Sequence, residues 1–110
     1  MSDAAPSGAD GVEVQRVGHV CLIRPRGRFD YNLYGAFHAA AQRAHAMDGV
    51  SEFQVDLDDV VYLDSSALGM LLKFQADIRP TGGSLTLLHA KGVVREILDI
   101  ANIQAIIALR

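Results

Sequence analysis

The sequence predicts an α/β domain built on a mixed sheet with crossover helices, in the element order β-β-α-β-α-β-α. Three observations predict it. The chain has 110 residues, which is the length of one ordinary domain. Half of its residues are hydrophobic and 21% are charged, which is a globular composition. Short segments that alternate apolar and polar residues are separated by longer segments in which apolar residues recur at helical spacing.

Two strands are predicted near the N-terminus, after a polar segment. Residues 1–11 are small, polar and interrupted by glycine and proline, so we expect a flexible tail. Two short strands then lie on either side of Gly18. Residues 20–23 are apolar on both faces, which is typical of a central strand, and Pro25 and Gly27 end it.

A helix and a third strand follow. The helix opens at Asp30, with Asn32 as the competing cap, and stops at an aspartate–glycine pair. Apolar residues recur along one of its faces, and His38 and His45 are expected on the opposite face. Alternation over residues 52–57 predicts a strand with one polar face.

The second half of the chain repeats this pattern. Residues 58–63 carry the chain to a helix that spans about Ser65–Ile78, and a turn at residues 80–83 leads to a strand at residues 84–87. A third helix has an apolar stripe formed by Val94, Ile97, Leu98 and Ala101. Residues 105–109 form either an edge strand or a packed terminal turn.

Composition and motifs argue against several classes of function. The net charge is −3, which disfavours nucleic-acid binding. No apolar run approaches the roughly 18–20 residues that span a bilayer, and no signal peptide is evident, so we expect a cytoplasmic protein without membrane insertion. The sequence holds no nucleophile elbow, phosphate loop, dinucleotide fingerprint or zinc-protease motif. We therefore expect no enzyme, no catalytic residue and no cofactor.

The histidines and the cysteine favour structural roles. His38 and His45 lie two helical turns apart, which is too far to share a metal ion without a ligand at the turn between them. Solvated histidines on a helix face are therefore favoured over a metal site. Cys21 is the only cysteine, so no internal disulfide forms, and its apolar strand favours a buried, inert thiol.

Four aspartates, Asp56, Asp58, Asp59 and Asp64, lie within nine residues. The favoured interpretation is a solvated strand edge and turn. A carboxylate metal site is the sharper alternative, but no second carboxylate cluster converges on it from elsewhere, so we expect no metal.

Three candidate helix caps stand in a row at Asp64, Ser65 and Ser66. Each has a short oxygen side chain that accepts a hydrogen bond from a free N–H group of the first helical turn. One cap is enough for a helix. The extra hydroxyl, on Ser65 or Ser66, is expected to be exposed at a strand-to-helix corner, next to the positive end of the helix.

The same helix carries an unusual polar face. At 100° per residue, Ser66, Gly69, Met70, Lys73 and Asp77 fall in the arc opposite the apolar one. Met70 is a large apolar residue in that arc, and glycine at position 69 lets another molecule approach closely. We expect Gly69, Met70 and Lys73 to form an exposed partner-binding patch.

The segment VDLDDVVYLDSSALGMLLKF resembles the signature of the STAS domain (sulfate transporter and anti-sigma factor antagonist). It is most similar to that of the stand-alone bacterial anti-sigma factor antagonists. Residues 27–40 (GRFDYNLYGAFHAA) and 82–103 (GGSLTLLHAKGVVREILDIANI) resemble further parts of the same family. The resemblance covers residues 12–110 and implies a STAS-like open mixed sheet of four to five strands.

The resemblance also implies roles for individual residues. Ser65 matches the serine that a partner kinase phosphorylates, and Asp64 matches the aspartate before it. Asp30 matches an acidic residue near the phosphorylation site, and Ser66 is a further neighbour. Ala67 stands where the family usually has glycine, which implies a stiffer turn beside Ser65.

The implied function is that of a switchable binding module. Unphosphorylated, the protein would bind an anti-sigma factor that is also a serine kinase, so that a sigma factor is released for transcription. Phosphorylation of Ser65 would end the binding, and a serine phosphatase would restore it. The sequence does not decide whether the protein also forms a weak homodimer.

Two other functions remain as alternatives. In one, the chain is a fixed STAS subunit of a lipid-transport ABC complex, and Ser65 only caps the helix. In the other, which ranks last, it is a sensor of nucleotides or small ligands.

Overall fold

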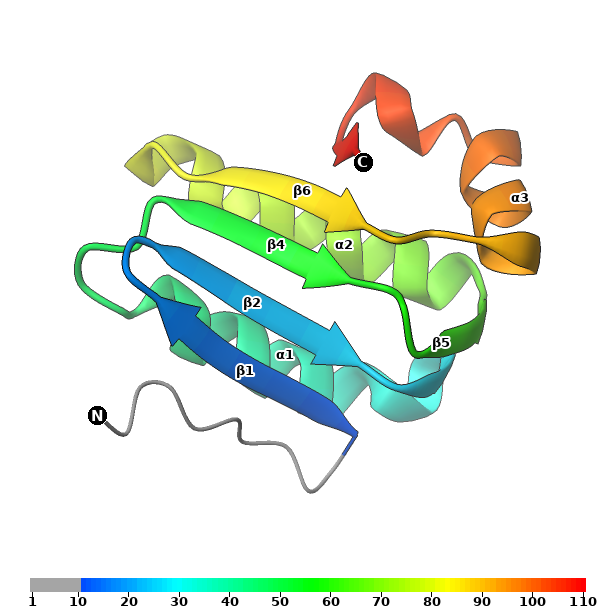
Figure 1. Cartoon of the computed structure of the whole chain (residues 1–110), viewed down its shortest axis with the longest axis horizontal. Coiled ribbons are helices and arrows are strands. Elements are labelled where there is room, and N and C mark those ends of the chain that lie inside the picture. Colours follow the sequence, from blue (N-terminus) through cyan, green and yellow to red (C-terminus); the bar gives the residue numbers. More distant parts are fainter. Residues whose placement is uncertain (1–10) are drawn as a thin grey trace.

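The computed structural model describes residues 11–110, so the tail predicted for residues 1–11 lies, except for Gly11, outside the described residues. In these residues a five-stranded sheet is backed by two helices, and a second, two-stranded sheet lies beyond one end of it (Figure 1). The elements in chain order are β1 (Val12–Val17), β2 (Val20–Pro25), β3 (Gly27–Phe29), α1 (Tyr34–His45), β4 (Glu52–Asp56), β5 (Val60–Leu63), α2 (Ser65–Ile78), β6 (Ser84–Leu88), α3 (Gly92–Ile100) and β7 (Ala108–Leu109).

The large sheet has the strand order β1-β2-β4-β6-β7. β1 pairs with β2 in an antiparallel hairpin that turns at Gly18, where φ is +62°. The remaining neighbours pair in parallel, because a helix returns the chain to the same end of the sheet each time. The predicted mixed sheet is confirmed, and β2 lies between two strands as its apolar faces indicate.

Of the two alternatives predicted for residues 105–109, the edge strand is observed, over Ala108–Leu109. A 3₁₀ turn at Ile103–Ala105 packs Ile103 into the core, and β7 then pairs with β6 at the edge of the sheet. The third helix also follows its predicted stripe, with Val94 and Leu98 buried. Ala101 is exposed, contrary to that prediction, because α3 ends one residue before it.

The two-stranded sheet of β3 and β5 is absent from the sequence-based prediction. β3 pairs in parallel with β5, and Phe29 lies opposite Leu63. These strands have three and four residues, which is too short for an alternating pattern to stand out. Gly27 follows β2 with φ +76°, and its N–H donates to the Asp59 carbonyl at 2.9 Å, so the glycine predicted as a strand end also starts a new strand.

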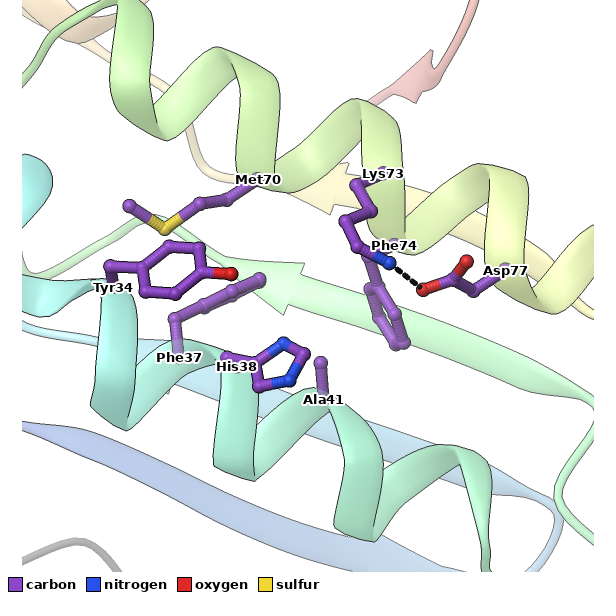
Figure 2. A pocket seen from close by; sticks show the side chains of 8 residues that line it. All are labelled: Tyr34, Phe37, His38, Ala41, Met70, Lys73, Phe74 and Asp77. Atoms are coloured by element: carbon purple, nitrogen blue, oxygen red, sulfur yellow. Dashed lines mark hydrogen bonds and ion pairs between the residues drawn. The ribbon is translucent and has the colours of Figure 1, made fainter.

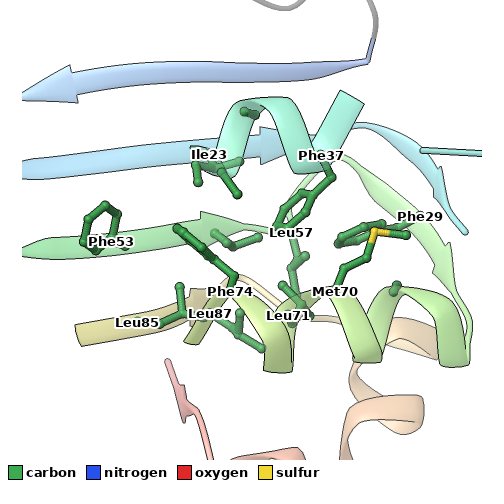
Figure 3. Packing of buried hydrophobic residues seen from close by; sticks show 14 of the residues in the cluster. Ile23, Phe29, Phe37, Phe53, Leu57, Met70, Leu71, Phe74, Leu85 and Leu87 are labelled. Carbon is green, nitrogen blue, oxygen red and sulfur yellow. The ribbon is translucent and has the colours of Figure 1, made fainter. Parts of the chain in front are cut away.

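The core lies between the sheet and the helices α1 and α2. Alternate residues of the strands point toward these helices, and Phe53 of β4 meets Phe74 of α2 with ring centres 5.5 Å apart (Figure 3). Phe74 also contacts Phe37 of α1 at 6.2 Å, edge to face. Both helices begin at the end of the sheet where β3 and β5 lie, so their N-termini are neighbours (Figure 1).

Candidate functional site

The corner where β3 and β5 end joins the beginnings of two helices. Phe29 and Leu63 are fully buried, and the Asp64 N–H donates to the Phe29 carbonyl at 3.4 Å. Asp30 and Asp64 each follow one of these strands. Since the side chains of a strand alternate between its faces, both carboxylates point away from the core.

Each of these aspartates caps a helix. The Asp30 carboxylate accepts from the Asn32 N–H at 3.0 Å, at the start of a 3₁₀ turn that leads into α1. The Asp64 carboxylate accepts from the Ala67 N–H at 3.2 Å, at the start of α2. The alternative cap at Asn32 is therefore wrong, and Ser65 is not the cap of α2, because Asp64 already fills that position.

Ser65 is the first residue of α2 and is exposed, whereas Ser66 is half-buried. The structure thus resolves which of the two serines presents its hydroxyl at the corner. The first N–H groups of a helix have no partner within the helix, and the helix dipole makes this end positive. An anion attached to Ser65 would lie near this positive helix end and also near the Asp64 carboxylate.

A cation stands beside Asp30. Arg28 of β3 lies 3.5 Å from the Asp30 carboxylate, and its guanidinium lies over the Tyr62 ring, 4.5 Å from the ring centre. Arg28 and Tyr62 face each other in the β3–β5 pairing. They lie on the same face of this small sheet as Asp30 and Asp64, because each precedes its aspartate by two residues.

Met70 is buried, with 8% of its surface exposed, so its prediction as an exposed contact is wrong. The helical projection assumes that one face of α2 is covered. In the structure α2 is covered twice, by the sheet and by α1, and Met70 points toward Tyr34 of α1 (Figure 2). Gly69 and Lys73 are exposed as predicted, and no atom lies within 4 Å of the position of a Cβ on Gly69.

A small groove with a cavity volume of about 30 Å³ lies between α1 and α2. Side chains from both helices point into it (Figure 2). Its principal lining residues are Tyr34, Phe37 and His38 of α1 and Met70, Lys73 and Phe74 of α2. Sequence patterns do not reveal the groove, because it forms only where two helices that are far apart in the chain pack together.

The cluster of aspartates serves internal ion pairs. Asp56, predicted to be solvated, is buried and accepts hydrogen bonds from His89 at 2.8 Å and Arg24 at 3.4 Å. Burial alone would raise the pKa of the Asp56 carboxyl, but the bonds from His89, the Asp58 N–H and Arg24 outweigh burial and hold the pKa below its ordinary value. Asp58 is exposed, as predicted, and pairs with Lys91. Within residues 11–110, no three histidine, cysteine, aspartate or glutamate side chains are placed to hold a metal ion.

The structure agrees with the predicted burial of the Cys21 thiol but not with the predicted solvation of the two helix histidines. Cys21 is fully buried, and burial raises the pKa of its thiol to about 11, as expected for an inert thiol. His38 and His45 are half-buried rather than solvated, because their side of α1 faces α2. His38 stacks on Tyr34, and His45 lies 3.2 Å from the Thr81 hydroxyl.

None of the helices in the described part of the chain is long and apolar enough to span a membrane.

A mixed five-stranded sheet backed by two helices is the fold of STAS-type α/β domains. A family model described as "Mlab, STAS domain" matches residues 12–108, and the chain belongs to this family of STAS domains.

Similar proteins include a curated relative and several solved structures. The "STAS-domain containing protein PA14_20770" of Pseudomonas aeruginosa is 34% identical over 104 residues, which cover 94% of each chain. An anti-sigma factor antagonist from Mycobacterium paratuberculosis superposes with a TM-score of 0.79 at 18% identity, over 89% of this chain and 82% of that one.

The Bacillus anti-sigma factor antagonist SpoIIAA matches in two forms. Its unphosphorylated form gives a TM-score of 0.70 at 18% identity, over 90% of this chain and 86% of that one. Its phosphorylated form gives 0.68 at 16% identity, over 90% of each chain. At these identities the solved structures establish the fold.

Proposed function

We propose that this protein is an anti-sigma factor antagonist that phosphorylation of Ser65 switches off. Unphosphorylated, it binds an anti-sigma factor serine kinase and thereby releases a sigma factor. The single observation that carries the proposal is the exposed Ser65 at the first position of α2, directly after the aspartate that caps the helix. A hydroxyl placed there is accessible to a kinase and is not needed to hold the helix.

The kinase transfers the γ-phosphoryl group of ATP to the Ser65 hydroxyl. The bond from phosphorus to the serine oxygen forms as the bond to ADP breaks, and the hydroxyl proton leaves to the kinase or to water. A serine phosphatase hydrolyses the ester and returns the protein to its binding form. This chain supplies the acceptor serine and no catalytic group.

The local electrostatics support a switch that leaves the fold unchanged. A phosphate adds about 1.5–2 negative charges at neutral pH, and the N-terminus of α2 tolerates an anion. The SpoIIAA structures that share this fold include both an unphosphorylated and a phosphorylated form. We therefore expect the phosphate to act on the partner rather than on the packing of this protein.

Charge repulsion and desolvation determine how strongly phosphorylation weakens binding to the partner. Phosphate on Ser65 joins the carboxylates of Asp30 and Asp64 on one corner, with Arg28 as the cation beside them. A partner that covers this corner has to remove the dianion from water, which costs several kcal/mol when no cation compensates it. A cost of about 3 kcal/mol lowers affinity more than a hundredfold.

Gly69 supports a contact on the adjacent turn of α2. Glycine inside a helix costs about 0.8–1 kcal/mol relative to alanine. The packing of the chain on itself does not require it, since a Cβ at this position would meet no atom within 4 Å. Close approach by another molecule would explain why a glycine stands at this position. We place the partner on Ser65, Gly69 and Lys73, with Ser66 at the margin.

The test is phosphopeptide mass spectrometry after incubation with ATP and candidate anti-sigma factor kinases. We expect phosphate on Ser65, its loss in Ser65→Ala, and its retention in the matched control Ser66→Ala. Binding to the same kinase should fall more than a hundredfold in Ser65→Asp and persist in Ser65→Ala. Tight binding of Ser65→Asp, or phosphate on Ser66 instead, would refute the proposal.

A second candidate is the fixed STAS subunit of a lipid-transport ABC complex. The family model that matches the chain favours it, because its description names Mlab and not an anti-sigma factor antagonist. In that function, α2 docks permanently on an ATPase and Ser65 is never modified. Affinity purification from the native cell separates the two, since one partner is a serine kinase and the other a transport ATPase with its permease.

A further inference from the structure

An open cleft lies beside the edge of the large sheet, away from the Ser65 corner. Its volume is about 560 Å³, within the roughly 300–1,000 Å³ that is typical of ligand sites. Its walls come from the end of α2 with Gln75 and Arg79, the start of β6 with Ser84 and Leu85, and the segment before β7 with Ala105 and Ile106. Gln75 follows Ser65 by ten residues, which is about 15 Å along the helix axis, so the proposed switch does not account for this cleft.

One wall of the cleft is a strand edge that lacks a neighbour. β4 pairs with all of β6, but β7 pairs only with Thr86 and Leu87. Alternate residues of a strand direct their backbone groups to opposite neighbours. The Leu87 carbonyl accepts from the Arg110 N–H on the β7 side. Leu85, two residues earlier, therefore directs its backbone groups to the same side, where the cleft lies.

The Leu85 N–H has no acceptor in the segment that leads into β7. If β7 began earlier, the parallel ladder would bring this N–H to the Ile106 carbonyl. That carbonyl instead accepts from the Gln75 side-chain amide at 2.8 Å. Residues 103–107 accept no hydrogen bond from the Leu85 N–H. A backbone donor that faces a cleft in this way is suited to an incoming carbonyl group.

Arg79 brings an unpaired positive charge to the cleft. The chain has ten lysines and arginines, and nine of them interact with another group in residues 11–110. Arg79 is exposed, and its guanidinium forms no hydrogen bond or ion pair with the described residues. No other ionisable side chain lines the cleft. Since a guanidinium binds a carboxylate through two parallel hydrogen bonds, the cleft favours a ligand with a carboxylate.

We propose that this cleft binds an extended peptide segment that carries a carboxylate. The peptide adds to the start of β6 where β7 does not reach, so that one of its carbonyls accepts from the Leu85 N–H and its carboxylate pairs with Arg79. Ile106, which is 54% exposed, packs against an apolar side chain of the peptide. Strand addition to a free sheet edge is a recurrent mode of peptide recognition. A small anion would use Arg79 alone and leave the strand edge without a role.

The test is an NMR titration of the full chain with N-acetyl-valyl-aspartyl-valine methylamide at low salt. The signals followed are the Leu85 amide and the Arg79 Nε–H, with the amide of Gly69, which does not line the cleft, as internal reference. We expect both signals to shift and saturate, with a dissociation constant on the order of 1–10 mM. The asparaginyl analogue, which lacks the charge, should bind about three- to tenfold more weakly. Inorganic phosphate should shift only the Arg79 signal.

Two matched pairs of variants test the location. Arg79→Gln should weaken binding of the aspartyl peptide about three- to tenfold, and Arg95→Gln, at an exposed arginine outside the cleft, should leave it unchanged. Ala105 lines the cleft and Ala76 does not, and both are exposed, so phenylalanine at either position leaves the core intact. Ala105→Phe should weaken binding at least about tenfold, and Ala76→Phe should not.

Several results would overturn the proposal. A Leu85 amide that does not shift, or full binding to Ala105→Phe, shows that no peptide adds to β6. Equal binding of the asparaginyl analogue, or equal losses in Arg79→Gln and Arg95→Gln, removes the role of Arg79. Phosphate that shifts both signals assigns the cleft to small anions, and the same shifts on raising the protein concentration alone assign it to a second copy of this chain. These outcomes are independent of whether Ser65 is phosphorylated, because no group of the cleft takes part in that reaction.

Discussion

Replacing Asp56 by asparagine tests whether the buried carboxylate of β4 stabilises the fold through its charge. Asparagine keeps the shape and one acceptor oxygen, which still accepts from the Asp58 N–H. It removes the charge that faces Arg24 and His89. The matched control is Asp59→Asn, since Asp59 is exposed on the following turn and its side chain has no ion pair within 4.0 Å in the described chain.

The expected loss of stability in Asp56→Asn depends on how exposed the two cationic partners of Asp56 are. A hydrogen bond to a charged group contributes about 1.5–3 kcal/mol when it is buried. The side chains of Arg24 and His89 are 31% and 60% exposed, so water compensates much of their loss. We expect Asp56→Asn to lower the free energy of unfolding by about 1–2 kcal/mol near pH 5, and Asp59→Asn to change it by less than about 0.5 kcal/mol.

The pH dependence has a definite sign. The pKa of the Asp56 carboxyl is lowered in the folded state, so its contribution to stability is present above the unfolded pKa of about 3.9. It is lost as the pH falls through the folded pKa, because the carboxyl is then protonated. Urea unfolding near pH 5 and below about pH 3 measures the difference. A difference between parent and variant that is the same at both pH values would refute a stabilising role for the charge.

Three further predictions concern the core, the thiol and the helix cap. Leu71 is fully buried, so Leu71→Ala should lower the free energy of unfolding by about 2–5 kcal/mol in thermal denaturation, against less than about 0.5 kcal/mol for the exposed Ile100→Ala. Cys21, with a thiol pKa of about 11, should not react with a disulfide reagent at pH 8 in the native protein, and a fast reaction there would contradict its burial. Asp64→Ala should lower the free energy of unfolding by about 1 kcal/mol in urea denaturation, and Ser65→Ala should lower it by less than half of that. A larger loss for Ser65→Ala than for Asp64→Ala would show that Ser65 caps the helix.

Local signals in the sequence were sufficient for the helix that carries the site. An Asp-Ser-Ser run marks its beginning, and proline and two glycines follow its end, so the expected Ser65–Ile78 agrees with the observed helix. The same signals limited the candidates for the exposed serine to Ser65 and Ser66. Only the three-dimensional packing decides between them, since Asp64 occupies the capping position and leaves the Ser65 hydroxyl free.

Long-range packing explains what the sequence could not predict. The β3–β5 pairing joins segments more than thirty residues apart in the sequence, and each strand is too short to show a period. Met70 was placed on the exposed side because a helical projection contains no information about a second neighbour. The groove shares this origin, since half of its wall comes from α1 and half from α2.

The bond between the Asp64 N–H and the Phe29 carbonyl fastens the start of α2 to the strand that leads into α1. We therefore expect the two helix ends to keep their relative positions, because the paired strands β3 and β5 lead directly into them. If a partner binds this corner as proposed, this protein should lose little conformational entropy on binding. Association should then need no slow rearrangement of this protein beforehand.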